Sequence, residues 1–194
     1  MNMWNQLSNW LYRVFSGWVT ISALLIFIVF TALVLPGQSS GDAAQSGDTD
    51  SPDLSIYYSA NDLYRMAEGY GKSGRANYIQ ARFTFDLIWP LVYTFFLVTC
   101  LSWIYGRALT AESKWRKINL LPVLGMVGDY LENISTSAVM WRYPLPTPII
   151  DWMAGVFTAL KWLFIGCSFA GLLIGGAILI WKTISQDKAG VQIK

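Results

Sequence analysis

The sequence contains no histidine and only two cysteines. Without histidine the chain lacks the commonest general base and the commonest ligand of zinc or haem, so its chemistry must use carboxylates, tyrosines, lysine or arginine. Cys100 and Cys167 both lie in apolar segments, which argues against a disulfide framework or a C-x-x-C metal motif in the polar loops. We therefore expect no metal and no cofactor.

Charge is also scarce. Charged residues make up 13% of the chain and hydrophobic residues 54%, whereas about a quarter of an ordinary soluble domain is charged. The net charge of +2 is too small to indicate nucleic-acid binding, and the basic residues lie at the edges of apolar segments. Composition therefore predicts one membrane domain, residues 1–194, with the lipid bilayer as partner and no nucleic acid.

Four apolar runs are long enough to cross a bilayer, which takes about 20 residues for each span. The predicted spans cover residues 17–35, 78–105, 120–141 and 152–181. A cleaved signal peptide is the alternative for the first run, but the long apolar core and the single Arg13 before it favour a retained anchor. The predicted fold class is an all-α integral membrane protein, a four-transmembrane-helix bundle in up-down-up-down order.

The connection after the first predicted span is polar. Residues 37–53 are rich in Gly, Ser, Asp and Ala without an apolar period, so we expect a mobile linker. Ser59 then resembles a helix N-cap, with Asp62 three residues on as in a capping box. Apolar side chains recur at helical spacing until Gly71. We predict a short amphipathic helix at about 60–70, on the outer surface.

The basic residues predict the orientation of the spans. They precede the first span, fill the connection between the second and third spans, and continue in the C-terminal tail, whereas the long first loop is acidic. The positive-inside rule then places both termini in the cytoplasm, and the pattern suits a prokaryotic plasma membrane. The basic residues that carry this prediction are Arg13, Arg107, Lys114, Arg116, Lys117, Lys182, Lys188 and Lys194.

Ionisable and polar residues inside the predicted spans are the candidate site, because such residues are costly in lipid and face a bundle interior by default. On the second and third spans they recur at three-four spacing, so each helix has one polar stripe and one lipid-facing side. The candidate binding residues are Arg82, Asp86, Tyr93, Asp129, Glu132, Asn133 and Lys161.

Depth along each helix suggests that these residues meet. At about 1.5 Å per residue, Asp86 lies roughly 10 Å below the outer end of its predicted helix, and Glu132 and Asn133 roughly 12 to 15 Å below theirs. Lys161 enters from the outer end of the fourth span. Pro90 cannot donate to the carbonyl of Asp86, which predicts a kink there. We expect one polar pocket that opens toward the outside.

Two interpretations of this polar set remain open. Arg82 with Asp86, and Lys161 with Asp129 or Glu132, can be salt bridges that fix the register of the helices. Alternatively, the set handles a ligand or protons, and one of the three acids is protonated. The residue types alone do not separate these interpretations.

Three family resemblances fall short of an assignment. Gly125-Met-Val-Gly-Asp129 is similar to the Gly-x-Gly-Asp motif of intramembrane aspartyl proteases, with Asp86 as second acid, but it is one residue longer. The size and interior acids resemble sterol isomerases and sigma-2-type receptors, but the isomerases rely on histidine. The tetraspan layout is similar to that of claudins, without their loop cysteines.

We carry three functional hypotheses. The first is a non-enzymatic protein that binds a lipid, a small apolar molecule or a partner membrane subunit, including a second copy of the chain, in the polar pocket. The second is an intramembrane enzyme acting on a lipid or isoprenoid, with Asp86, Asp129 and Glu132 as acid-base groups. The third is an oligomeric transporter or proton-coupled carrier.

Overall fold

The computed structural model describes residues 3–36, 51–52 and 55–191, with side chains described up to residue 186. All regular structure in these ranges is helical. This agrees with the predicted all-α class. The predicted mobile linker, residues 37–53, falls outside the described residues except for 51–52, so its mobility stays a prediction.

The N-terminal part forms two helices at nearly a right angle. Helix α1, Met3–Val14, was not expected from the sequence. Helix α2, Gly17–Leu33, matches the first predicted span closely. The two helices are bent by 92° at the break between them. Ser16 caps α2, because its side-chain oxygen accepts from the backbone N–H of Val19 at 3.5 Å.

The predicted outer helix is present as α4, Ala60–Gly69. Its capping box is confirmed: Ser59 accepts from the backbone of Asp62, and the Asp62 carboxylate accepts from the backbone of Ser59. Gly71 has a φ of 61°, which glycine adopts without strain. The chain turns there directly into α5, Gly71–Arg82.

The second predicted span, residues 78–105, is divided in the structure. Helix α5 ends at Arg82 and helix α6, Phe85–Ala108, begins after a two-residue break. Thr84 at this break turns its hydroxyl back onto the carbonyl of Gln80 at 2.8 Å, a local hydrogen bond of the kind that competes with helix continuation. Asp86 therefore lies in the first turn of α6, whereas we expected it about two turns inside a continuous helix.

The third and fourth predicted spans correspond to the last two long helices. A 3-10 helix, η2 (Lys114–Leu120), leads into α7, Leu121–Arg142. The proline-rich turn after α7 is non-helical as expected, and α8 then covers Ile150–Val191. With 42 residues, α8 is about 63 Å long at 1.5 Å per residue, far longer than its predicted span.

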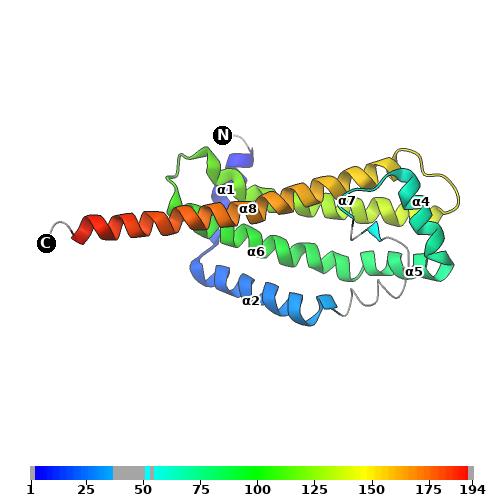
Figure 1. Cartoon of the computed structure of the whole chain (residues 1–194), viewed down its shortest axis with the longest axis horizontal. Helices are drawn as coiled ribbons and strands as arrows, with labels where there is room; N and C mark the ends of the chain where they lie inside the picture. Colours follow the sequence, from blue (N-terminus) through cyan, green and yellow to red (C-terminus); the bar gives the residue numbers. More distant parts are fainter. Residues whose placement is uncertain (1–2, 37–50, 53–54, 192–194) are drawn as a thin grey trace.

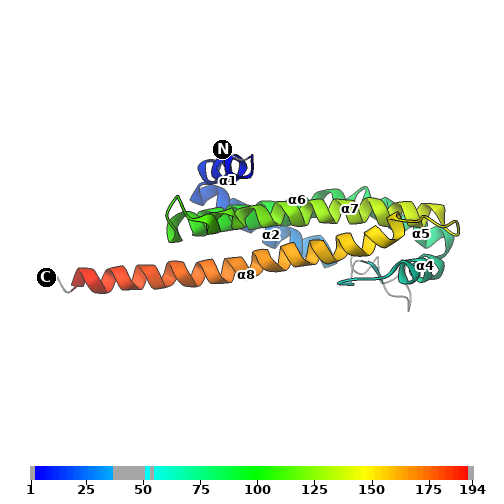
Figure 2. The same ribbon diagram turned by 90° about the horizontal axis from the view of Figure 1, so that it is seen from above.

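Helices α6, α7 and α8 pack side by side along the length of the molecule, and α2 lies along α6 (Figure 1). Phe27 and Phe30 of α2 stack on an aromatic row of α6 that includes Phe85, Trp89 and Phe96. Figure 2 shows α4 and α5 at one end of the bundle, and the last turns of α8 beyond the other end.

Glycines allow the closest helix contacts. A side chain at Gly128 of α7 would meet the backbone nitrogen of Lys161 on α8 at 3.3 Å. The Gly171–Gly175 pair faces other helices of the bundle: a side chain at Gly175 would meet Tyr105 of α6 at 2.5 Å. This small-residue pair therefore packs within the bundle.

Two apolar helical runs can cross a membrane by length and composition, Gly71–Ala108 and Ile150–Gln186. The bent pair α1 and α2 makes a third if it is counted as one span. The protein is therefore an all-helical protein with two to three candidate membrane-spanning segments among the described residues. Helix α7, which carries Asp129 and Glu132 in its middle, does not count among them.

The capping box of α4 generates a first prediction. Ser59→Ala removes the N-cap and should destabilise α4 by about 1 kcal/mol, as cap removal commonly does. Hydrogen exchange of the α4 amides should quicken about fivefold, with α7 amides unchanged as the internal control. The hydrogen bonds from Ser59, and to a smaller extent the one from Arg65, lower the pKa of Asp62 from 3.8 to about 2.

The same pKa shift sets the pH range in which the cap operates. Because the folded pKa of Asp62 is depressed, its stabilising contribution is present above pH 3.8 and is lost as the pH falls through about 2. Equal exchange rates for the wild type and Ser59→Ala at neutral pH would contradict this role of the cap.

Candidate functional site: a buried polar cluster between α6, α7 and α8

The centre of the cluster is an ion pair between α7 and α8. Lys161 Nζ lies 2.5 Å from Glu132 Oε2, and only 9% and 1% of the two side chains are exposed. Lys161 reaches Glu132 because Gly128, one turn earlier on α7, lets the backbones of the two helices approach closely. An ion pair this deeply buried needs further hydrogen bonds to offset the lost hydration.

Two hydroxyl groups supply such hydrogen bonds on the other carboxylate oxygen. Thr158, one turn before Lys161 on α8, donates to Glu132 Oε1 at 2.6 Å. Tyr58, from the segment that precedes α4, donates to the same oxygen at 3.3 Å. Both donors are buried. Glu132 is thus held by an ammonium group and a hydroxyl group from α8 and by a second hydroxyl group from the segment before α4.

Asp129, one turn before Glu132 on α7, binds two neutral donors. Tyr93 of α6 donates its hydroxyl to Asp129 Oδ2 at 3.0 Å. Asn133 donates its side-chain N–H to Asp129 Oδ1 at 3.1 Å. Hydrogen bonds to a carboxylate favour its charged form. The polar stripe of α7 therefore faces both neighbours, α6 through Asp129 and α8 through Glu132.

A second ion pair lies at the junction of α5 and α6. Arg82, the last residue of α5, lies 2.9 Å from Asp86 in the first turn of α6. The guanidinium also lies over the ring of Tyr78, 4.3 Å from its centroid, an arrangement that attracts a cation to the aromatic face. This pair bridges the two-residue break between α5 and α6.

The segment before α4 is fastened to α8 along its length. Trp162 of α8 donates its indole N–H to the carbonyl of Ser55 at 3.0 Å. At Gly155 the backbone of Tyr58 comes so close that a side chain there would lie 2.0 Å from the Tyr58 carbonyl oxygen. Tyr64 donates to Asp151 at 3.2 Å. We call residues 55–69 the outer segment; it covers the Glu132 end of the cluster.

All seven predicted site residues are buried, and most of them meet through α7. Tyr93, Asn133 and Lys161 contact Asp129 or Glu132 directly, whereas Arg82 and Asp86 pair with each other. That the cluster opens toward the outside stays a prediction.

Sequence reasoning missed Tyr58 and Thr158. Thr158 had a signal, because it lies three residues before Lys161 and so on the same helix face. Tyr58 had none, since it follows the polar linker in a segment without periodicity.

The chemistry of the cluster is hydrogen bonding and ion pairing. Among the described residues, no group of three or more Cys, Asp and Glu side chains could hold a metal ion. Asp86 pairs with a guanidinium, Asp129 accepts from two neutral donors, and Glu132 pairs with an ammonium group and accepts from two hydroxyl groups. The intramembrane enzyme and the carrier stay predictions, and no contact of the described residues favours either.

Comparison with protein-family models, with curated proteins and with solved structures finds no match to this chain. The function must therefore be argued from the geometry of the chain itself.

The close approach at Gly155 generates a second prediction. Gly155→Ala places a methyl group on the Tyr58 carbonyl, so the outer segment must move and Tyr58 should lose its hydrogen bond to Glu132. Limited proteolysis should then cut the outer segment at least severalfold faster than in the wild type.

Gly166→Ala is the matched control, because Gly166 lies on the same helix with nothing within 4 Å of the added atom. Alanine is favoured over glycine in a helix by up to about 1 kcal/mol, so this control should be neutral or slightly stabilising. Equal protease resistance of the two variants would show that the outer segment does not depend on this contact.

Proposed function

We propose that the chain crosses the bilayer four times, with α2, α6, α7 and α8 in up-down-up-down order. Helix α2, with 17 residues, is about 26 Å long, close to the hydrocarbon thickness of about 30 Å. Helix α7 carries its charges toward α6 and α8 rather than toward lipid, which lets a less apolar helix cross a bilayer inside a bundle. Its exposed side carries Val127, Leu131 and Ile134.

The positions of basic residues support cytoplasmic termini in this layout. Arg13 ends α1, Arg107 ends α6 and the basic η2 follows. Lys182 of α8 reaches the same end, since its ammonium donates to the carbonyl of Arg107 at 2.9 Å. These basic residues lie at one end of the bundle, which the positive-inside rule assigns to the cytoplasmic face of a prokaryotic plasma membrane.

The lengths of the helices suggest where the outer edge of the bilayer lies along the bundle. The last turns of α2 stack on the first turns of α6, through Phe30 on Phe85 and Trp89. If α2 spans the whole hydrocarbon layer, the outer edge of the bilayer is near the start of α6, and the polar helix α5 lies in water. Tyr93, eight residues after Phe85, is then about 12 Å below this outer edge. This puts the cluster in the outer half of the membrane.

For function, we propose a non-enzymatic protein that binds a lipid or a small amphiphile at this cluster. The observation that carries the proposal is the ion pair of Glu132 and Lys161, buried between helices and covered by the outer segment. Replacing a buried ion pair by apolar residues often costs nothing or stabilises a protein. A pair kept at this depth in a membrane protein is by default a functional site.

The contacts of Glu132 indicate the chemistry of the ligand. Of the two hydroxyl donors on Oε1, Tyr58 is the more distant, at 3.3 Å against 2.6 Å for Thr158. Tyr58 also belongs to the one element of the cluster that is not part of a long helix. A ligand hydroxyl or ammonium group can therefore replace Tyr58 on Glu132, while the apolar part of the ligand lies in the adjoining lipid.

A third prediction tests the binding site. The double variant Glu132→Gln/Lys161→Met removes both charges and should keep the fold, whereas Lys161→Met alone leaves a buried carboxylate and should lose about 3–5 kcal/mol. The wild type and the double variant are purified in mild detergent, and co-purified lipids and small molecules are compared by native mass spectrometry. We expect a bound molecule that the double variant retains at least tenfold less.

Arg82→Gln/Asp86→Asn is the matched control, because it removes the other ion pair and leaves Lys161, Thr158 and Tyr58 in place around Glu132. The proposal is contradicted if the wild type and the Glu132 double variant carry the same molecules in equal amounts. Loss of folding in both double variants would instead identify the two pairs as structural links between helices.

A further inference from the structure

Helix α1 is held firmly across the cytoplasmic end of the bundle. Ser8 donates to Asn119 at 2.8 Å, and Asn119 in turn donates to Ser102 of α6 at 3.1 Å. Tyr12 donates to the carbonyl of Arg116 at 2.8 Å, and the Arg116 guanidinium covers the Tyr12 ring at 3.8 Å. With the 92° bend to α2, these contacts set α1 across the direction of the span (Figure 2).

Most of the exposed residues of α1, Trp4 apart, fall on two stripes. Met3, Leu7, Trp10 and Val14 recur at intervals of four, three and four, so they share one apolar face. Gln6, Asn9 and Arg13 recur at intervals of three and four on the neighbouring face, and all three are exposed.

Three of the four residues of the apolar stripe are not covered by the bundle. Met3 is 67% exposed, Trp10 53% and Val14 45%, whereas Leu7 packs partly against the inner core. The helix instead turns Ser8 and Leu11 toward η2 and α6. An exposed tryptophan between two exposed aliphatic side chains needs an apolar environment that the described residues do not provide.

We propose that α1 lies in the plane of the inner leaflet, with the apolar stripe among the acyl chains and the polar stripe toward the cytoplasm. The partner that covers the apolar stripe is thus the phospholipid bilayer. A helix with one apolar and one polar face, joined at a right angle to a span, has the geometry of an interfacial helix. This inference depends on the cytoplasmic orientation but not on ligand binding at Glu132.

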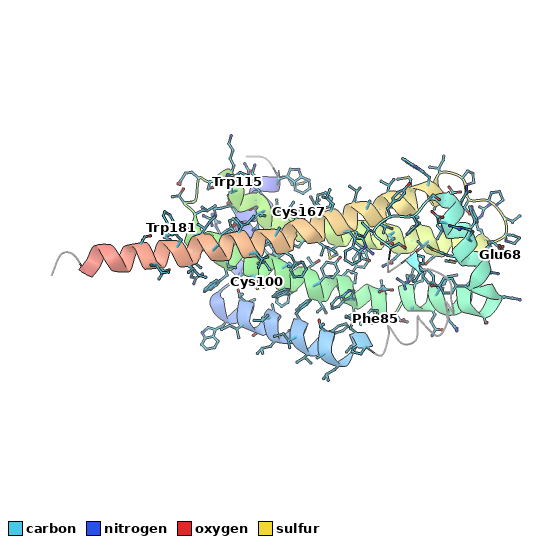
Figure 3. The ribbon with its side chains drawn as sticks, viewed as in Figure 1. Glu68, Phe85, Cys100, Trp115, Cys167 and Trp181 are labelled. Atoms are coloured by element: carbon cyan, nitrogen blue, oxygen red, sulfur yellow. The ribbon has the colours of Figure 1, made fainter. Side chains whose placement is uncertain are left out.

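The charges and aromatic residues around α1 suit this surface. Arg13 and the exposed Lys114 and Lys117 lie at the same end of the chain's bundle, where their cationic groups can meet lipid phosphates. Trp18 in the first turn of α2 is 81% exposed and Trp115 in η2 is 75% exposed, as tryptophans at a membrane interface are. Figure 3 places Trp115 at this end and Glu68 at the opposite end.

A comparison of four exposed positions tests the inference. In the full chain with Cys100→Ala and Cys167→Ser, single cysteines are placed by Trp10→Cys, Val14→Cys, Gln6→Cys and Asn9→Cys, and each carries a nitroxide label. The variants are reconstituted in vesicles of phosphatidylcholine and phosphatidylglycerol. Accessibility to oxygen, which dissolves in acyl chains, is compared with accessibility to a water-soluble nickel chelate.

We expect the labels at positions 10 and 14 to be severalfold more accessible to oxygen than to the nickel chelate, and those at 6 and 9 to show the opposite order. Because all four positions are exposed in the structure, only a surrounding bilayer separates them in this way. Equal nickel accessibility at all four would overturn the inference. Protection of 10 and 14 from both reagents would also overturn it, in favour of a protein partner or a second copy.

Each variant is checked for a monodisperse elution profile and for helix content before labelling. The readout does not involve Glu132 or Lys161, so it can fail while ligand binding at the cluster stands, and the reverse also holds.

Discussion

The close contact of α7 with α8 is the constraint on which the rest of the arrangement depends. Gly128 lets the backbone of Lys161 come within 3.3 Å of where a side chain would begin, and this brings the ammonium onto Glu132. Once these charges are buried, the remaining oxygen of Glu132 requires donors. Thr158 and Tyr58 supply them, and Tyr58 thereby draws the outer segment onto the bundle.

The polar stripe of α7 connects this helix to α6, to α8 and to the outer segment. Asp129 binds α6 through Tyr93, and Glu132 binds α8 and the outer segment. Hydrogen bonds of this kind are directional, whereas the burial of apolar surface is not. The same interactions can therefore both set the register of the helices and hold a polar group of a ligand, which joins the two interpretations of the sequence.

Several features were predictable because they depend on local spacing. The capping box at Ser59 and the polar faces of α6 and α7 follow from three-four periodicity. The break between α5 and α6 was missed because Phe83 and Thr84 are neither glycine nor proline. Helix α1 was missed because it is short and because the apolar run that follows it is longer and more continuous than its own apolar stripe.

The sequence by itself determined that the chain is helical, that it carries apolar runs long enough to cross a membrane, and which polar residues are buried between helices, since composition and helical period carry that information. Only the tertiary structure decided that Lys161 reaches Glu132 and that Tyr58 donates to the same carboxylate. These choices depend on how far two helices approach and where a non-periodic segment lies. Such distances arise from packing between residues far apart in the chain, which local spacing does not encode.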